Sequence, residues 1–383
     1  MPIPSGGTTM GGTAQTTQPG GQQQAQSVAS VAFIRATNEH VENIADVSLL
    51  VTTAVQTFPN FSIPAYGYLR YVVLHVIATG GVGAATYTED GPFNALQNVI
   101  LQEPNGAIIS QYNSGYDLYL VNKYGGYMGY NEPKSRANYA ASLTNGNFEF
   151  LLRIPVEINE RMALGALPNE NSAAAFQVRV QLNSQAGIYA TGPATTNPTV
   201  RVRAWAEEWD QPQQSTNGVP NEVVPPAMNT TQFWTPQVYP VVTGVNTIRL
   251  TRVGNYIRDL LFIFRVSTRA AGETNWPDVV TLFLDARPLV YLQKGVWRSK
   301  QYERSGYSYS TAVALDTVNS QDSGVFSYDF MHEFDGSYGH EQNDLWLPTL
   351  GSTRLELQGN FGAAGTLTVL TNDIGVAGNV FVH

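Results

Sequence analysis

Two long apolar stretches constrain the fold of this chain more than any other feature of its sequence. Residues 67–79 are mostly β-branched, aromatic and leucine side chains, and the stretch ends at Gly80 and Gly81. It is shorter than the roughly 20 residues of a membrane-spanning helix, and its composition favours a strand inside a sheet. Residues 255–268 repeat the order of tyrosine, branched aliphatic, arginine, one further residue and an apolar run. The chain is therefore predicted to use one strand-rich unit twice.

Two shorter matches follow the long ones in the same order and support the duplication. They pair residues 152–155 with 345–348, and residues 179–182 with 354–357. A single four-residue match arises easily by chance. Three matches in the same order, the long one and the two short ones, do not. The duplication predicts two units of the same topology, with Tyr68 and Tyr256 on equivalent strands.

The composition suits a β-protein of two domains. The chain has 383 residues, which is long for one domain, and each half can bury its own core. Charged residues make up 13% of it, roughly half of the usual share of about 25%. So few charges suit a surface that neighbouring molecules cover. An ordinary uncharged β-protein is the alternative interpretation.

Charge and cysteine content exclude several classes of protein. The net charge is -9, so we expect no broad basic surface and no sequence-specific binding of nucleic acid. The sequence has no cysteine, which excludes disulfides, thiolate metal sites and a cysteine nucleophile. It shows neither a secretory leader nor an apolar run of about 20 residues. We therefore expect a protein that is made in the cytoplasm of its host.

Four segments are predicted along the chain. They are a low-complexity arm (1–35), a first β-unit (36–210), a linker rich in Gln, Asn, Ser and Pro (211–229) and a second β-unit (230–383). Residues 148–156 and 176–182 alternate between apolar and other side chains, as strands with one buried face do. Short helices are expected in loops, one of them capped by Ser114 and ended at Gly125. Many short strands and few helices predict an all-β fold of two β-sandwiches or jelly rolls.

The N-terminal arm has no charged residue before Arg35, whereas arms that bind nucleic acid are basic. Val28, Val31, Ala32 and Arg35 have the spacing of one face of a helix. This face is a candidate contact with a neighbouring subunit or with a lipid surface. A frayed tail is the alternative.

One segment of the first unit carries a recognisable order of turn and helix residues. It holds Gly91, Pro92, Asn94, Gln97, Asn98, Val99, Ile100, Glu103, Pro104, Ser114, Gly115, Tyr116, Leu118, Val121 and Asn122. In order and spacing these residues resemble the first jelly roll of the major capsid protein of tectiviruses, which are phages with a membrane inside an icosahedral shell. The close match covers residues 66–125. The second half has no motif that can be matched residue by residue.

The resemblance implies a double jelly roll, in which two tandem eight-stranded barrels stand with their strands normal to the capsid. Three copies would form a pseudo-hexagonal, homotrimeric capsomer of the virion, and the arm would lie on the inner face near the internal membrane. The implied partners are further copies of the chain, vertex (penton) and minor capsid proteins, and that lipid membrane. Such a protein is not an enzyme and needs no cofactor.

A two-domain jelly-roll metal enzyme of the bicupin type is the main alternative, and a carbohydrate-binding β-sandwich protein is another. Candidate metal ligands gather in one segment, at His332, Glu333, Asp335, His340, Glu341 and Asp344. A cupin site needs two histidines and a carboxylate on one face of the barrel, but the second residue after His332 is a phenylalanine. His40 and His75 lie far apart in sequence. We therefore expect an exposed polar loop, with no metal site and no catalytic residue.

One cluster combines basic and aromatic residues and is a candidate contact between subunits. Its members are Lys294, Arg298, Lys300 and Arg304, with Tyr291, Trp297 and Tyr302 among them. Such a cluster can stack and pair with a nucleic-acid strand. In an acidic chain, charge pairing across a subunit interface is the favoured interpretation.

Overall fold

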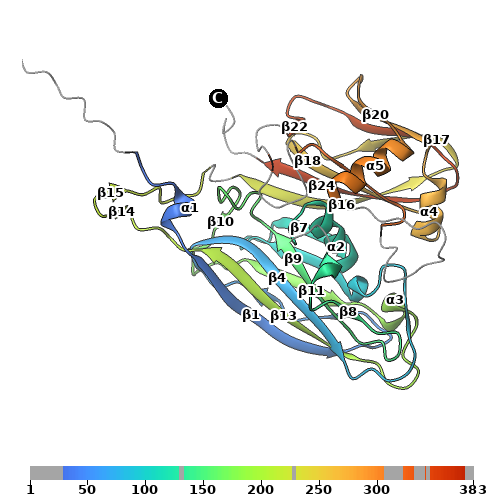
Figure 1. Cartoon of the computed structure of the whole chain (residues 1–383), viewed down its shortest axis with the longest axis horizontal. Coiled ribbons are helices and arrows are strands. Elements are labelled where there is room, and N and C mark those ends of the chain that lie inside the picture. The colour runs from blue at the N-terminus through green and yellow to red at the C-terminus, as the bar shows by residue number, and fades with distance from the viewer. Residues whose placement is uncertain are drawn as a thin grey trace, which may run out of the picture.

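The chain folds into two β-sandwich units that lie side by side (Figure 1). The computed structural model describes residues 29–128, 133–226, 230–305, 322–331, 341 and 346–375. The N-terminal unit runs from β1 (Glu39–Leu50) to β13 (Thr199–Trp209), and the C-terminal unit runs from β16 (Thr231–Val241) to β24 (Gly365–Gly375). The predicted boundaries of the arm, the two units and the linker stay predictions.

The N-terminal unit consists of two antiparallel sheets. Its further strands are β2 (Gln56–Thr57), β3 (Phe61–Ser62), β4 (Tyr68–Thr79), β6 (Leu96–Gln102), β7 (Ile108–Ser114), β8 (Ala140–Ala141), β9 (Phe148–Pro155), β10 (Leu167–Pro168) and β11 (Gln177–Leu182). The first sheet has the order β1-β13-β4-β9-β8, and β10 pairs with the start of β4. The second has the order β2-β11-β6-β7, and β3 shares the position of β2 beside β11.

The C-terminal unit repeats this arrangement. Its further strands are β17 (Gly244–Leu250), β18 (Tyr256–Arg265), β19 (Val279–Leu284), β20 (Arg287–Gln293), β21 (Val325–Asp329), β22 (Leu347–Pro348) and β23 (Leu355–Phe361). One sheet has the order β16-β24-β18-β21 and the other has the order β17-β23-β19-β20. Numbered from the start of each unit, these are the strand positions of the N-terminal unit. The predicted duplication is therefore confirmed.

The equivalence of the two units extends to single residues. Tyr68 and Tyr256 are the first residues of β4 and β18, which hold the same position in their sheets. Tyr68 pairs with Pro168 of β10, and Tyr256 pairs with Pro348 of β22. The predicted equivalence of the two tyrosines is thus confirmed.

Of the two shorter sequence matches, one is correct and the other is wrong. Residues 179–182 lie on β11 and residues 355–357 lie on β23, which are equivalent strands. Residues 152–155 belong to β9, which pairs along the middle of β4, whereas residues 347–348 form β22 at the start of β18. The counterpart of β22 is β10, at residues 167–168. An aliphatic residue before proline occurs in both places, and only the pairing partner distinguishes them.

Short helices and two small two-stranded sheets fill the connections between strands. The helices are α1 (Phe33–Ala36), η1 (Phe93–Ala95), α2 (Gly115–Tyr124), η2 (Pro133–Ser135), α3 (Gln185–Ile188), α4 (Arg269–Asn275) and α5 (Lys294–Ser305). As predicted, Ser114 caps α2, and the helix ends before Gly125. β5 (Thr86–Tyr87) pairs with β12 (Tyr189–Thr191), and β14 (Ser215–Thr216) pairs with β15 (Val219–Pro220). Within the described ranges, the helices are too short or too polar to span a bilayer.

The two units share a sheet and part of a core. β7 pairs in parallel with β16 through Ser110 and Trp234, so one sheet runs from the N-terminal unit into the C-terminal unit. The core of the N-terminal sandwich includes Trp234 and Leu261 of the other unit. A second core surrounds the stacked rings of Trp276 and Phe326, whose centroids lie 4.1 Å apart. This shared packing joins the units into one body.

Candidate functional site

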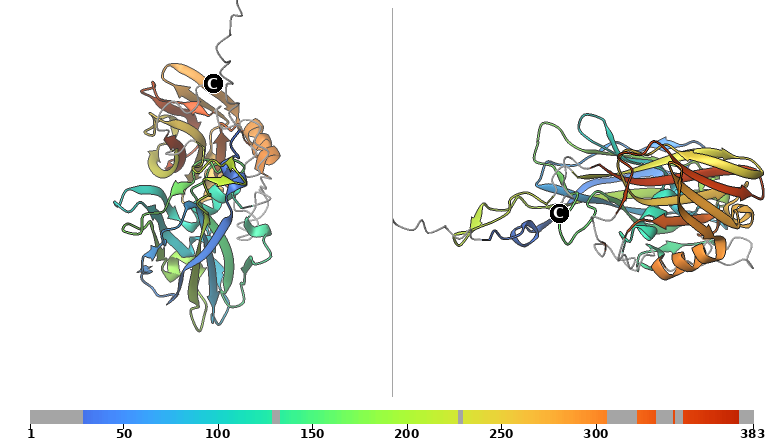
Figure 2. Two further views of the ribbon diagram at one scale, coloured as in Figure 1. Left: turned by 90° about the vertical axis from the view of Figure 1, so that its left-hand side faces the viewer. Right: turned by 90° about the horizontal axis from the view of Figure 1, so that it is seen from above.

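Residues 30–37 dock on the segment that joins the two units. The N–H of Val31 donates to the carbonyl of Pro220 at 2.9 Å, and the carbonyl of Val31 accepts from the N–H of Glu222 at 2.9 Å. The carboxylate of Glu222 accepts from the hydroxyl of Ser30 and from the N–H of Phe33. Figure 2 shows α1 and the β14–β15 hairpin projecting together beyond the sheets. The hairpin therefore holds the start of the described chain.

Phe33 is the side chain that anchors this segment. It is 1% exposed and packs with Tyr68, Ala163, Ala166 and Trp209. Its ring meets the ring of Tyr68 edge-on, with centroids 5.3 Å apart. Sequence reasoning missed Phe33, although an aromatic residue next to an uncharged, low-complexity arm was a usable signal.

The described structure contains three of the four residues of the predicted contact face of the arm. Val28 lies outside the described residues. Val31 is half-buried against its own chain, whereas Ala32 and Arg35 are exposed. The helix α1 has four residues, so helical spacing holds for one turn only. Contact of this face with a neighbouring subunit or a lipid surface stays a prediction.

The predicted basic cluster lies on α5. Lys294 and Arg298 both form ion pairs with the buried carboxylate of Glu273 on α4. Arg304 pairs with Asp329 of β21. Each of these three cations therefore has a carboxylate partner within the chain, which weakens the nucleic-acid interpretation. A role of the cluster between subunits stays a prediction.

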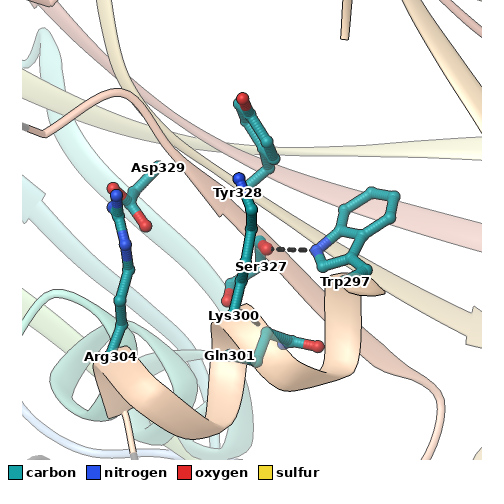
Figure 3. A pocket seen from close by; sticks show the side chains of 7 residues that line it. All are labelled: Trp297, Lys300, Gln301, Arg304, Ser327, Tyr328 and Asp329. Carbon is teal, nitrogen blue, oxygen red and sulfur yellow. Dashed lines mark hydrogen bonds and ion pairs between the residues drawn. The ribbon is translucent and has the colours of Figure 1, made fainter. Parts of the chain in front are cut away.

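Lys300 differs from the other three cations of the cluster. It is exposed and makes no ion pair with any residue that the structure describes. It borders a cavity of about 40 Å³ between α5 and β21, where the indole N–H of Trp297 donates to the carbonyl of Ser327 at 2.5 Å (Figure 3). Sites for organic ligands usually exceed about 300 Å³. The cavity therefore has room for water alone.

Equivalent strands of the two units each bury an arginine and its carboxylate partner. Nε of Arg70 in β4 lies 3.0 Å from Oε2 of Glu157, and Nε of Arg258 in β18 lies 2.8 Å from Oε1 of Glu341. All four side chains are at most 2% exposed. Paired in this way, each carboxylate compensates the charge of a buried guanidinium group.

Each of these carboxylates also accepts a hydrogen bond from an indole. Trp209 donates to Glu157 at 2.7 Å, and Trp346 donates to Glu341 at 3.4 Å. Glu341 is one of the candidate metal ligands predicted between His332 and Asp344. Its two oxygens accept hydrogen bonds from Arg258 and Trp346 instead. The other candidates, His332, Glu333, Asp335, His340 and Asp344, lie outside the described residues.

Ion pairs also fix the contact between the two units. Asp90 of the N-terminal unit lies 2.9 Å from Nη2 of Arg265 and 2.7 Å from Nε of Arg269. Burial acts to raise the pKa of Asp90, but the two guanidinium groups together hold it below its ordinary value. Lys123 and Asp322, both buried, pair at 2.6 Å. These charges set the orientation of one unit on the other.

One further group of polar side chains comes together at one end of the N-terminal unit. His40 and Glu42 of β1 and Glu208 of β13 have candidate ligand atoms within 4.8 Å of one another. Burial raises the pKa of Glu208 to about 7, a hydrogen bond from Asn169 lowers it, and the charge of Glu42 raises it. Sequence reasoning set His40 aside because His75, the other histidine of the first half, lies far from it in sequence. The group has one histidine, whereas a cupin site uses two.

No protein-family model and no curated protein sequence matches the chain. Its fold, however, matches solved structures. A chain in the atomic structure of Sulfolobus turreted icosahedral virus matches with a TM-score of 0.59 and 11% identity, over 88% of this chain and 91% of that one. The STIV MCP matches with a TM-score of 0.58 and 12% identity, over 88% and 97%. The PBCV-1 virus capsid matches with a TM-score of 0.56 and 14% identity, over 88% and 94%.

The chain has the double jelly-roll fold. The two units are its two jelly rolls, and each has eight strand positions, as the resemblance implied. The solved double jelly rolls that resemble it are viral capsid proteins. At 11% to 14% identity, the likeness concerns the fold. The narrower expectation of a tectivirus protein stays a prediction.

Proposed function

We propose that this double jelly roll is the major capsid protein of an icosahedral virus and has no catalytic role. The observation that carries the proposal is the pair of jelly rolls with one topology, joined side by side through β7 and β16. A shell built from such chains receives two similar blocks for each polypeptide. The solved structures of similar fold, which come from a virus particle and a virus capsid, support the same role.

The capsomer of this proposal is a homotrimer. Three chains closed into a ring place six similar jelly rolls around one centre, which gives a pseudo-hexagonal outline. Closed cyclic symmetry is the usual outcome for soluble assemblies of one chain. Few charges favour large interfaces of uncharged side chains, of the class that buries roughly 2,000 Å² or more.

Two sheet edges that have no further partner strand among the described residues support a ring of this kind. β1 is the edge of one sheet and exposes Val41 and Leu50 by 55% and 51%, and β20 is the edge of another and exposes Tyr291 by 73%. Figure 1 shows the two strands at opposite ends of the molecule. In soluble proteins an exposed apolar edge strand is usually covered, because its free backbone groups can otherwise pair with another chain. A contact between β1 of one copy and β20 of the next is head-to-tail, and a head-to-tail contact can close into a ring.

The further partners in this proposal are neighbouring capsomers, vertex and minor capsid proteins and an internal lipid membrane. The protein would be assembled in the host cytoplasm and located in the virion capsid. Support for the membrane comes from the arm, which has no charged residue before Arg35. A lipid-facing or protein-facing position suits such an arm better than a position facing the genome.

Light scattering after size exclusion tests the proposal. The expected mass is three times the 41.8 kDa of one chain, and it should persist on dilution to nanomolar subunit concentrations. Deletion of residues 1–30 should leave the trimer intact but reduce incorporation into membrane-containing particles. A clean monomer at micromolar concentration would exclude the capsomer. Normal incorporation of the truncated chain would leave the arm without its proposed role.

A further inference from the structure

The strand register brings three candidate ligands to one place. His40 of β1 lies directly opposite Glu208 of the antiparallel strand β13. Glu42 is two residues after His40 and therefore projects from the same face of the strand. The relevant nitrogen and carboxylate oxygens of the three side chains lie within 4.8 Å of one another. Two strands that are remote in sequence thus supply an imidazole and two carboxylates to a single point.

Glu208 is out of place among its neighbours on β13. The preceding residues of its face, Val200, Val202, Ala204 and Ala206, are apolar and buried in the core. Glu208 continues this face and is 0% exposed. A carboxylate at the end of an apolar core face needs a compensating partner, because burial of an uncompensated charge is costly.

That compensation is incomplete. Oε1 of Glu208 accepts a hydrogen bond from Nδ2 of Asn169 at 2.7 Å, but the buried atom Oε2 has no hydrogen-bond partner among the described residues. Glu208 forms no ion pair within the same part of the chain, and Glu42 pairs there only with His40, at 3.9 Å. The site therefore combines two carboxylates, one imidazole and one unused, buried ligand atom.

We propose that Nε2 of His40 and the carboxylates of Glu42 and Glu208 bind one divalent transition-metal ion, for which zinc is the representative probe. Mixed nitrogen and oxygen ligands suit zinc or manganese, whereas calcium and magnesium prefer oxygen alone. Three protein ligands leave one position for water. This inference does not depend on the proposed function, and it departs from the expectation that the chain binds no metal.

The site can contract to the size that an ion requires. Ligand atoms at about 2.0–2.2 Å from one zinc ion are roughly 3.3 Å apart, so the side chains must move inward. Glu42 is 42% exposed and can rotate, whereas the buried Glu208 is the fixed member. The ring of Tyr66 lies against the imidazole, with centroids 4.1 Å apart, and orients it. The hydrogen bond from Asn169 to Oε1 orients the carboxylate of Glu208.

The test uses the full-length protein after removal of metals with a chelator. Equilibrium dialysis against zinc, with metal content measured by mass spectrometry, should give one ion per chain at micromolar or lower free zinc. Calcium should bind at least tenfold more weakly, because it gains little from the imidazole. His40→Gln and Glu208→Gln should each weaken zinc binding at least tenfold. Glu208→Gln keeps an acceptor for Asn169, so the local fold should be preserved.

His75→Gln is the matched control. His75 also faces a glutamate on the neighbouring strand of the same sheet, with Nε2 lying 2.7 Å from Glu149, but no second carboxylate from the described part of the chain joins that pair. Zinc binding should be unchanged in this variant. The proposal is overturned if the wild-type chain has no saturable zinc site. It is also overturned if His75→Gln loses as much affinity as His40→Gln, or if calcium binds as tightly as zinc.

Discussion

Arg258 holds the place in β18 that Arg70 holds in β4. Each is the third residue of its strand, and each is buried against one glutamate that also accepts a hydrogen bond from an indole. The duplication of the jelly roll therefore includes a buried polar contact as well as the strand order. Since both ends of this contact are excluded from water, each unit depends on its own pair.

Removal of one partner of such a pair should be strongly destabilising. Glu341→Gln leaves the guanidinium of Arg258, which forms no other ion pair with the described residues, buried without its counter-charge, and the free energy of unfolding should fall by about 3–5 kcal/mol. Asp46→Asn is the control, because Asp46 and its partner Arg201 are 40% and 42% exposed, and its effect should stay below about 1 kcal/mol. Denaturation by urea at one fixed protein concentration measures both. Equal effects of the two substitutions would contradict the structural role of the buried pair.

Stability should depend on pH through Asp259. Burial raises the pKa of Asp259 to about 7, although Arg258 lowers it in part. The folded state then binds more protons than the unfolded state between the ordinary value of 3.8 and about 7. Stability contributed by this group therefore falls as pH rises through that range, by at most about 1.4 kcal/mol per pH unit.

Asp259→Asn removes this dependence. The melting temperature of the variant should exceed that of the wild-type chain by more at pH 8 than at pH 5. The exposed Asp278→Asn controls for the change from aspartate to asparagine. The prediction would be contradicted if the melting temperatures of Asp259→Asn and the wild-type chain differed by the same amount at both pH values.

Phe33 should control the attachment of the N-terminal segment. Phe33→Ala removes a ring packed against Tyr68 and Trp209, and a loss of this size in a core costs about 3–5 kcal/mol. The segment should therefore open more often, and trypsin should cleave after the exposed Arg35 at least tenfold faster. Ala32→Ser, at an exposed neighbour, should leave the rate unchanged. A rate equal to that of the wild-type chain in Phe33→Ala would show that the segment is held by its backbone bonds alone.

The two exposed sheet edges should carry the trimer contact. Val41→Lys and Tyr291→Lys each place a charge on an edge strand that the proposed ring buries. Each substitution should therefore raise the dissociation constant of the trimer at least tenfold. Leu350→Lys is the control, because Leu350 is 61% exposed and lies outside both edges. Sedimentation over a dilution series provides the measurement. A trimer that tolerates both edge substitutions must use another surface.

The sequence by itself determined the elements that depend on one stretch of chain. The tyrosine and arginine before each apolar run predicted the equivalence of β4 and β18, and Ser114 predicted the start of α2. Alternation also predicted the buried face of β9, where Phe148 and Phe150 are both buried. These patterns are visible because the period of a strand and the chemistry of a cap act within a few residues.

Only the tertiary structure decided which remote segments meet. The partners of the α5 cations, Glu273 and Asp329, could not be read from the sequence, and neither could the meeting of His40 with Glu208. The mistaken match of residues 345–348 has the same origin. An aliphatic residue followed by proline looks the same wherever it occurs, whereas its place is set by the strand beside it. Such pairings depend on the packing of both sandwiches together, because no local period specifies which strands lie side by side.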